Sequence, residues 1–314
     1  MARLSYGAAA CSALERAMAA DARVVALGED VGRGGIFGQY RGLQQKFGAA
    51  RVIDTPISES TIMGAAVGMA LGGLKPVVEM RVVDFALCAM DEIVNQAAKA
   101  RYMFGGQGRV PLVARLPIGI WSGSAAQHSQ SLEAWFAHVP GLVVVTPGSA
   151  QDNHSLLAAA IDSGDPVIYM EHKELWGLEG EVVEGERIPL GKAKVLQSGS
   201  DVTLVTWSRT VQTAIEAVKQ AKNISIELID LRTIWPWDRE TVLASAAKTR
   251  RLVVAHEAVR VAGFGAEIAA TVAEELGVPV RRVGGARIPA GYSKRLEDEA
   301  SIDAAAILKA LANF

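Results

Sequence analysis

Short runs of hydrophobic residues alternate with longer stretches of helical spacing over the first 170 residues of the chain. Buried apolar runs separated by helical patterns are typical of a parallel sheet that is covered on both faces. The pattern therefore predicts an α/β fold with a doubly wound sheet. The expected strands are residues 23–29, 51–54, 75–83, 111–117, 142–147 and 166–171. The expected helices lie near residues 5–20, 59–72, 84–104, 130–138 and 150–162.

The alternation stops at residues 174–200, which are rich in glycine and charge, and then resumes. Such a stretch is typical of an excursion and linker. We therefore predict two α/β domains, residues 1–185 and 201–314, with residues 186–200 as the linker. The expected strands of the second domain are residues 201–207, 224–230, 251–257 and 279–283, with helices near residues 209–222, 238–247, 264–276 and 301–312.

Length and composition fit this organisation and exclude some partners. The chain has 314 residues, enough for two domains, with 50% hydrophobic and 21% charged residues and a net charge of −2. No basic stripe could supply phosphate-driven affinity, so nucleic acid is not an expected partner. No apolar run approaches the ~20 residues that span a bilayer, so no membrane partner is expected either.

The amino-terminal residues and the cysteines favour a cytoplasmic protein. The first helical stretch carries Arg3, Glu15 and Arg16, so it reads as an amphipathic helix without a signal-peptide core. Cys11 and Cys88 are the only cysteines, and each lies in a helical apolar pattern. We expect both to be small buried thiols, because no zinc spacing is present.

In open parallel sheets, ligands bind beyond the carboxyl ends of the strands. The candidate site loops therefore follow residues 28, 54, 83, 117 and 146. The loop after residue 28 is rich in glycine but lacks a GxGxxG that opens a helix. It predicts backbone at positive φ rather than a dinucleotide site.

Glu59 follows the second of these loops, in DTPISESTIMGAAVGMALGG (54–73). Ser58 could cap the helix, and Glu59 in the first turn would complement its dipole by about 0.3–1 kcal/mol. Alternatively, a pocket requires the carboxylate. Glycines follow at positions 64, 68, 72 and 73. Each costs about 1 kcal/mol in a helix relative to alanine. They therefore suggest close approach by a backbone, a helix or a ligand.

His128 lies in the small, polar stretch WSGSAAQHSQSLEAWF (121–136), where a helix is expected to begin at residues 129–131. Such a histidine is either a satisfied loop residue or a catalytic one with room for substrate. The four other histidines share no metal spacing. The polar helix around Asn95, Gln96, Lys99 and Arg101 fits an exposed face, or a partly polar interface between helices.

The following stretches occur in this order along the chain: GEDVG (28–32), DTPISES (54–60), VDF (83–85), IVNQAAKARYMFGG (93–106), AAQHSQS (125–131), PGLVVVTP (140–147), DPVIYMEHK (165–173), DLRTIWPWD (230–238) and GFGAEIA (263–269). Together they resemble the beta subunit of thiamine-diphosphate-dependent 2-oxoacid dehydrogenases, of the pyruvate and acetoin dehydrogenase group, in which the same motifs have the same order. The resemblance covers nearly the whole chain and implies an amino-terminal pyrimidine-binding domain and a carboxyl-terminal transketolase-type domain.

The resemblance implies an enzyme that is active only with a partner. Thiamine diphosphate would bind between subunits, with its Mg²⁺ held by an alpha subunit through a GDG…N motif that this chain lacks. Two alpha and two beta subunits would form a heterotetramer that decarboxylates pyruvate and passes the acetyl unit to a lipoyl-bearing acyltransferase. Acetoin is the alternative substrate, branched-chain 2-oxoacids are less favoured, and a non-catalytic assembly module is the alternative of another class.

The resemblance also assigns site residues. Glu59 would bind the far nitrogen of the aminopyrimidine ring, so that the cofactor can act as its own base. Ile57 would touch the same ring, and Phe85 would stack near it. His128 would lie near the reacting carbon, stabilising oxygen charge or assisting transfer to lipoyl.

The resemblance further implies a potassium site, and at two positions, Arg81 and Arg287, the chain differs from the usual residue of the family. The residues that match the family's potassium site are Leu112, Ala160, Ile161, Ser163 and Asp165, although the family commonly has Asp and Asn at the last two positions. Arg81 stands where relatives often have an uncharged residue. It could repel the ring, pair with Glu59 or another acid, or point away. Arg287 replaces the Asp of a common DVP motif near the surface that docks the acyltransferase core.

Overall fold

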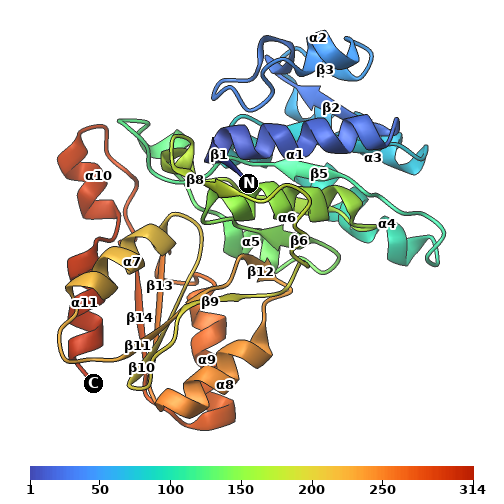
Figure 1. Cartoon of the computed structure of the whole chain (residues 1–314). Helices are drawn as coiled ribbons and strands as arrows, with labels where there is room; N and C mark the ends of the chain where they lie inside the picture. Colours follow the sequence, from blue (N-terminus) through green and yellow to red (C-terminus); the bar gives the residue numbers. More distant parts are fainter. The chain divides into compact units, whose positions relative to one another are not determined.

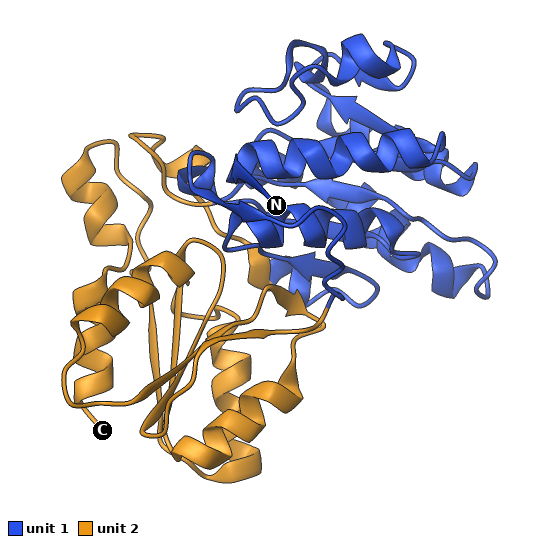
Figure 2. Cartoon of the chain, in the orientation of Figure 1, with its two compact units in different colours: residues 1–118, 135–190 blue, residues 119–134, 191–314 orange.

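The structure, a computed structural model, describes residues 1–314 and divides into two compact units (Figure 2). Unit 1 comprises residues 1–118 and 135–190, and unit 2 comprises residues 119–134 and 191–314. Residues 119–134 therefore belong to unit 2, although they lie in sequence between strands of unit 1. None of the helices in the chain is long and apolar enough to span a bilayer.

Unit 1 contains a parallel sheet in the order β6-β7-β5-β4-β2-β3 (Figure 1). Each predicted strand is present and is shorter than its apolar run. The strands are β2 (Val24–Gly28), β3 (Val52–Asp54), β4 (Lys75–Glu79), β5 (Val113–Arg115), β6 (Val143–Val145) and β7 (Val167–Tyr169).

Both faces of this sheet are buried, as the continuous apolar strands predict. Val24 and Ala26 of β2 pack into a core cluster with the helices α1 (Tyr6–Ala20) and α6 (Ala150–Asp162). Val25 and Leu27 are equally buried, and alternate residues of a strand point to opposite faces. The helix α3 (Glu59–Leu71) packs on β4, and the remaining helices of the chain segment before β6 are short: α2 (Leu43–Phe47), α4 (Ala98–Met103) and α5 (Glu133–Ala137).

The helical stretch predicted near residues 84–104 is present from Val83 to Met103, but it is not one uniform α-helix. The segment is divided into a 3-10 helix at Val83–Ala89, a π-helix at Glu92–Ala97 and α4. In the wider π turn, Asn95 and Gln96 donate hydrogen bonds to the Asp91 carboxylate at 2.7 and 3.1 Å. These residues follow Asp91 by four and five positions, and an i to i+5 turn brings both within reach of one carboxylate.

Residues 174–200 also contain more structure than a linker. The strand β8 (Glu179–Val182) pairs antiparallel with β1 (Ala2–Ser5), a strand that the apolar pattern did not predict. A further strand, β9 (Lys194–Gln197), pairs antiparallel with β11 of unit 2. These short strands have a largely exposed or half-exposed pattern, so hydrophobicity gave no signal for them.

Unit 2 contains a mixed sheet in the order β14-β13-β10-β11-β9. The helices α7 and α11 pack on one face of it through Ala214, Ala217, Ile307 and Leu311. The further strands of unit 2 are β10 (Val202–Thr206), β11 (Ile226–Asp230), β12 (Thr233–Trp235), β13 (Leu252–Val259) and β14 (Val280–Gly285). Its helices are α7 (Thr210–Gln220), α8 (Arg239–Thr249), α9 (Gly265–Leu276), α10 (Lys294–Ala300) and α11 (Ala304–Ala312), of which α10 was not predicted.

Two smaller predictions have opposite outcomes. The glycine-rich loop after β2 does contain positive φ, with Gly34 at 106° and Gly35 at 71°. The expectation of two buried thiols is wrong, because Cys88 is exposed and Cys11 is only partly buried. Cys88 lies in the 3-10 helix at Val83–Ala89, whose buried residues are Val83, Asp84, Ala86 and Ala89.

Candidate active site

Glu59 begins α3 beyond the carboxyl end of β3. Its side chain is half-buried and forms no ion pair. The capping prediction for Ser58 is wrong, because the Ser58 hydroxyl accepts no backbone hydrogen bond and instead donates to Thr61 Oγ1 at 2.8 Å. Glu59 is therefore the one acidic side chain in the first turn of a helix whose first N–H groups have no side-chain cap.

The side chains around Glu59 leave this helix end open. Ile57 is 77% exposed, unusually high for a large apolar side chain. The Thr55 hydroxyl is buried without a hydrogen-bond partner. Phe85, in the 3-10 helix after β4, is half-buried. The residues named for the aminopyrimidine ring therefore lie in unit 1, in the loops that follow β3 and β4.

The glycines of α3 are not explained by contacts within the chain. A Cβ at Gly64 would lie 3.7 Å from Glu92 Cγ, and one at Gly68 would meet nothing within 4 Å. Thr61, Ala65 and Gly68 are exposed on this helix. A close approach at these glycines therefore requires another molecule.

Arg81 pairs with two acids in the loop after β2. Its Nη1 lies 3.0 Å from Asp30 Oδ2 and 3.4 Å from Glu29 Oε2. Of the alternatives that the sequence left open, pairing with acids other than Glu59 is the one observed. Arg81 has φ of 57°, and its N–H donates to Glu79 Oε1 at 3.1 Å. The left-handed backbone and the ion pairs together fix the guanidinium beside Glu29.

Glu29 is only 7% exposed and links Arg81 to Glu59 electrostatically. Burial raises the pKa of the Glu29 carboxyl, the Arg81 charge lowers it, and the nearby Glu59 carboxylate raises it again. The Glu29 carboxyl is therefore influenced by one guanidinium and by a second carboxyl group beyond the carboxyl ends of the strands. Such coupled groups in a site loop are candidates for proton handling.

A buried ion pair lies further along the same edge of the sheet. Arg115 Nε and Nη2 each lie 2.8 Å from an oxygen of Glu171, and both side chains are fully buried. Asn153 Nδ2 donates to the same carboxylate at 3.0 Å. Glu79 lies nearby, 2% exposed, and burial raises its pKa to about 7.

Sequence analysis did not single out this network. The available signal was one charged residue within each of the apolar runs PLVARLP (111–117) and PVIYME (166–171). Charges are almost never fully buried unless they are paired. Two of them in apolar runs of neighbouring strands could therefore have been matched to each other.

His128 lies in unit 2, at the end of a 3-10 turn formed by Ala126–His128, and it is exposed. The expectation that a helix begins at residues 129–131 is wrong, since α5 begins at Glu133. The loop before His128 has positive φ at Ser122 and Ala125. The Gly123 N–H donates to Glu297 Oε1 at 2.6 Å, which ties this loop to α10 of the same unit.

The five residues expected at a potassium ion lie close together in unit 1. The Val167 N–H donates to the Leu112 carbonyl at 2.9 Å, and Ala160, Ile161 and Ser163 form the carboxyl end of α6. Carbonyl oxygens at a helix carboxyl end suit a hard cation. The Asp165 carboxylate, however, is paired with Arg101 at 2.6 Å. No group of three or more His, Cys, Asp or Glu side chains in the chain could hold a metal ion.

Two family profiles match the chain. "Transketolase, pyrimidine binding domain" matches residues 2–177, and "Transketolase, C-terminal domain" matches residues 191–307. A solved structure, "Split gene transketolase, inactive beta4 tetramer", superposes with a TM-score of 0.83 at 24% identity, covering 98% of this chain and 97% of that chain. At that identity the likeness concerns the fold.

Relatives with higher identity are beta subunits of two kinds of enzyme. The chain is 46% identical over 293 residues to "Pyruvate dehydrogenase E1 component subunit beta" of Rickettsia bellii, covering 91% of this chain and 90% of the relative. It is 45% identical over 298 residues to "Pyruvate dehydrogenase E1 component subunit beta-2, mitochondrial" of Oryza sativa, covering 91% of this chain and 79% of the relative. It is 42% identical over 314 residues to the beta subunit of acetoin:2,6-dichlorophenolindophenol oxidoreductase of Cupriavidus necator, covering 94% and 93%.

Proposed function

The chain belongs to the beta subunits of the thiamine-diphosphate-dependent 2-oxoacid dehydrogenases, of the pyruvate and acetoin dehydrogenase type, and from this we propose that it supplies half of an active site that decarboxylates pyruvate. The reaction would pass the acetyl unit to lipoyl on an acyltransferase. The other half of the site, with the Mg²⁺ and the diphosphate group, would belong to an alpha subunit in a two-alpha, two-beta heterotetramer.

One observation carries the proposal: Glu59 is a half-buried carboxylate without an ion pair, beside the exposed Ile57. An unpaired acid next to an exposed apolar side chain fits a ring that is apolar on its faces and polar at its edge. The orphaned Thr55 hydroxyl in the same loop adds an unmet hydrogen-bonding group. These residues therefore fit an aminopyrimidine ring.

Bound thiamine diphosphate would supply the carbanion chemistry that 2-oxoacid decarboxylation requires. Glu59 would hold a proton at the edge nitrogen of the ring, and Ile57 and Phe85 would contact the ring and keep water from it. The Glu59 carboxylate would in turn raise the pKa of the neighbouring Glu29. His128 would donate hydrogen bonds to oxygen charge and assist acyl transfer to lipoyl.

Exposed residues on α3 and α4 support a partner subunit. Tyr102, Met103 and Phe104 are three consecutive large apolar residues with exposures of 90%, 69% and 52%. Contiguous exposed apolar surface of this kind marks interaction sites. The open glycine positions of α3 would allow a partner helix to approach closely. We assign this surface to contacts with other subunits of the heterotetramer.

The potassium site is part of the same proposal. Leu112, Ala160, Ile161, Ser163 and Asp165 would bind K⁺ mainly through backbone carbonyls. The role of Asp165 would be limited to its carbonyl, since its carboxylate is held by Arg101.

Acetoin is the second candidate substrate, because the Cupriavidus relative aligns over 314 residues, which is more than the pyruvate dehydrogenase relatives do. Co-expression with an alpha subunit that carries GDG…N, followed by assays of pyruvate and acetoin with an artificial electron acceptor, would separate the two substrates. Absence of thiamine-dependent turnover with either substrate would favour a non-catalytic assembly module.

The Glu59→Gln variant tests the site directly in the assembled enzyme. We expect turnover to fall by about a hundredfold or more, because positioned proton transfer contributes 10²–10⁴-fold. Heterotetramer assembly should be unchanged by gel filtration, since Glu59 pairs with no other side chain. Turnover close to that of the unmodified enzyme would contradict the assignment of Glu59. The unpartnered chain should bind thiamine diphosphate only weakly by calorimetry.

A further inference from the structure

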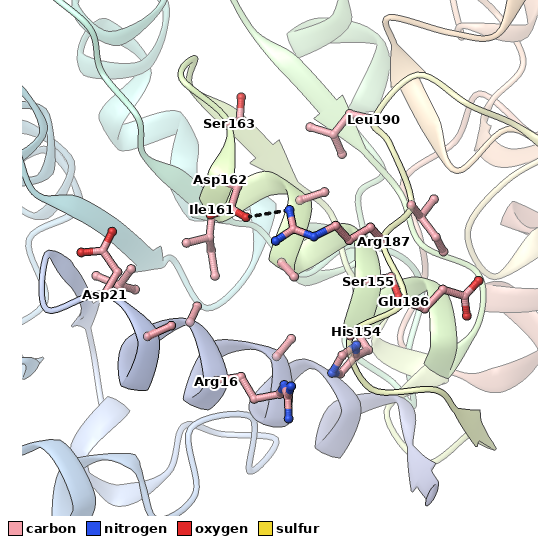
Figure 3. A pocket seen from close by; sticks show the side chains of 18 of the residues that line it. Arg16, Asp21, His154, Ser155, Ile161, Asp162, Ser163, Glu186, Arg187 and Leu190 are labelled. Atoms are coloured by element: carbon pink, nitrogen blue, oxygen red, sulfur yellow. Dashed lines mark ion pairs between the residues drawn. The ribbon is translucent and has the colours of Figure 1, made fainter. Parts of the chain in front are cut away.

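Unit 1 contains a cavity of about 710 Å³ that lies away from the candidate active site (Figure 3). Val24 and Lys75, the first residues of β2 and β4, line it, whereas the candidate active site lies at the carboxyl ends of these strands. The helices α1 and α6 form its walls, and residues 185–190 run along it. Its volume falls within the range of about 300–1,000 Å³ that is usual for small-molecule sites.

Small side chains leave this space between two helices that pack on each other. Alanines occur at positions 13, 17 and 20 on α1 and at positions 158 and 159 on α6. Ile161 and Ile188 add apolar surface and belong to the core cluster of unit 1. Alanines between helices are ordinary packing, so the walls alone do not identify a site.

His154 provides the second observation. It lines the cavity on α6, is only 2% exposed, and neither ring nitrogen has a hydrogen-bond partner. Figure 3 shows the ring at the seam between α1 and α6, on the side where Arg16 lies. Buried polar groups are nearly always hydrogen-bonded, so two unmet nitrogens on one ring require an explanation.

The imidazole offers both a donor and an acceptor. Burial lowers the pKa of His154, and the nearby Arg16 charge lowers it further, so the ring is neutral near pH 7. A neutral imidazole has one N–H donor and one acceptor nitrogen. A hydroxyl group could satisfy either nitrogen, and a carbonyl could accept from the donor.

The cations of the lining are already paired with acids, and Arg16 lies 2.8 Å from Glu184, which is outside the lining. Lys75 lies 3.3 Å from Asp21 and 3.7 Å from Asp162, and Arg187 lies 3.6 Å from Asp162. The lining has equal numbers of cations and acids, namely Arg16, Lys75 and Arg187 against Asp21, Asp162 and Glu186. An anionic ligand would lose hydration among apolar walls without gaining an unpaired cation, and Glu186, the acid of the lining without an ion pair, is exposed to solvent.

We propose that this cavity is a binding site for a small, uncharged organic molecule with an apolar body and one hydroxyl or carbonyl group that hydrogen-bonds to His154. The cavity is separate from Glu59, Ile57 and Phe85, because it lies at the opposite ends of the strands, and it borders Ile161 and Ser163 of the proposed potassium site. The Arg187 side chain is 89% exposed, so the rim beside residues 185–190 is open to solvent for entry.

Phenol and toluene are matched probes, because they differ only in a hydroxyl in place of a methyl group. The full chain would be labelled with ¹⁵N-histidine, and the His154 ring signals, among those of five histidines, would be identified with His154→Gln. We expect phenol to shift these signals saturably. We also expect it to bind about two- to tenfold more tightly than toluene, the usual effect of one net hydrogen bond. In His154→Leu, this preference should disappear.

Filling the cavity provides the control. Ala158→Leu should abolish binding of both probes, whereas Ala19→Leu, at an exposed position on α1 outside the cavity, should leave binding unchanged. If Ala158→Leu does not fold, Ala17→Leu on the opposite wall serves the same purpose. Equal affinities for phenol and toluene would overturn the proposal. Binding that survives the filled cavity, or a phenol-soaked crystal with only an ordered water at His154, would also overturn it.

Discussion

Two regions at the same edge of the unit 1 sheet differ in whether their charged side chains are buried and paired. Arg115 and Glu171 are fully buried, joined by two hydrogen bonds of 2.8 Å. Glu59 is half-buried, forms no ion pair and has the exposed Ile57 beside it. The closed region holds its charges with partners from the chain itself. The open region leaves the Glu59 carboxylate without an ion pair from the chain.

Hydrogen bonds, an ion pair and electrostatic interactions connect the two regions. Glu79 at the end of β4 interacts electrostatically with Arg115 and accepts a hydrogen bond from the Arg81 N–H. Arg81 in turn pairs with Glu29, whose pKa is affected by Glu59. The closed network therefore supports the loop that borders the open site.

The largest effect is expected from Arg115→Met, which leaves Glu171 buried without its cation. Breaking a buried pair by removing one partner costs about 3–5 kcal/mol. The free energy of unfolding, measured in urea, should fall by that amount.

The matched double variant Arg115→Met with Glu171→Gln removes both charges and keeps an acceptor for Asn153. It should recover most of the loss, because replacing both partners of a buried pair is often close to neutral. A double variant as unstable as Arg115→Met alone would show that packing, and not the ion pair, accounts for the effect.

The next effect is a pH dependence from Glu79. Burial raises its pKa from 4.5 to about 7, so the folded chain binds a proton that the unfolded chain releases. The free energy of unfolding should therefore fall as pH rises from about 4.5 to about 7, by at most about 3 kcal/mol, and then level off.

Glu79→Gln should remove this contribution while keeping an oxygen for the Arg81 N–H. His256, whose pKa burial lowers to about 4, acts in the opposite direction over pH 4 to 6.5. The difference in the free energy of unfolding between the unmodified chain and Glu79→Gln, followed over pH, therefore gives the contribution of Glu79 alone. If that difference does not vary with pH, Glu79 titrates at its ordinary pKa.

A smaller effect is expected from Arg81→Met at the border of the open site. The Arg81 charge lowers the pKa of Glu29, so its removal should raise that pKa further, as measured by carboxyl ¹³C NMR. The stability change should stay within about 1 kcal/mol, because the arginine side chain is partly exposed.

Arg81→Gly loses the same charge but fits the φ of 57° without strain. It should be more stable than Arg81→Met by about 1 kcal/mol, the usual cost of the left-handed region for a residue with a Cβ. A Glu29 pKa that is the same in all three proteins would exclude direct coupling to Arg81.

The smallest effect concerns the helix that Glu59 begins. Ser58→Ala should change the free energy of unfolding by less than about 0.5 kcal/mol, because its hydroxyl caps no backbone group. Ser149→Ala at the start of α6 should cost about 1 kcal/mol, since Ser149 Oγ accepts from the Asp152 N–H at 3.2 Å. Equal losses in thermal unfolding would restore the capping role of Ser58.

The long buried elements could be predicted from the sequence because their signal is local. The apolar runs located every strand of the unit 1 parallel sheet, and α6 agrees with its predicted limits at residues 150 and 162. Short elements with exposed patterns, such as β1 and β9, gave no such signal. The division of residues 84–104 also escaped prediction, since 3-10 and π turns share the composition of an α-helix.

Local sequence was enough to predict the alternating α/β order, the position of Glu59 at the start of a helix and the family resemblance, since each depends on residues close together in the chain. Only the tertiary structure paired Arg81 with Glu29 and Asp30, joined Arg115 to Glu171 and left His154 without a partner. These contacts link residues up to 56 positions apart. The partners of a buried charge or ring come from segments that are distant in the sequence and are brought together by packing. The local pattern of residues therefore does not predict them.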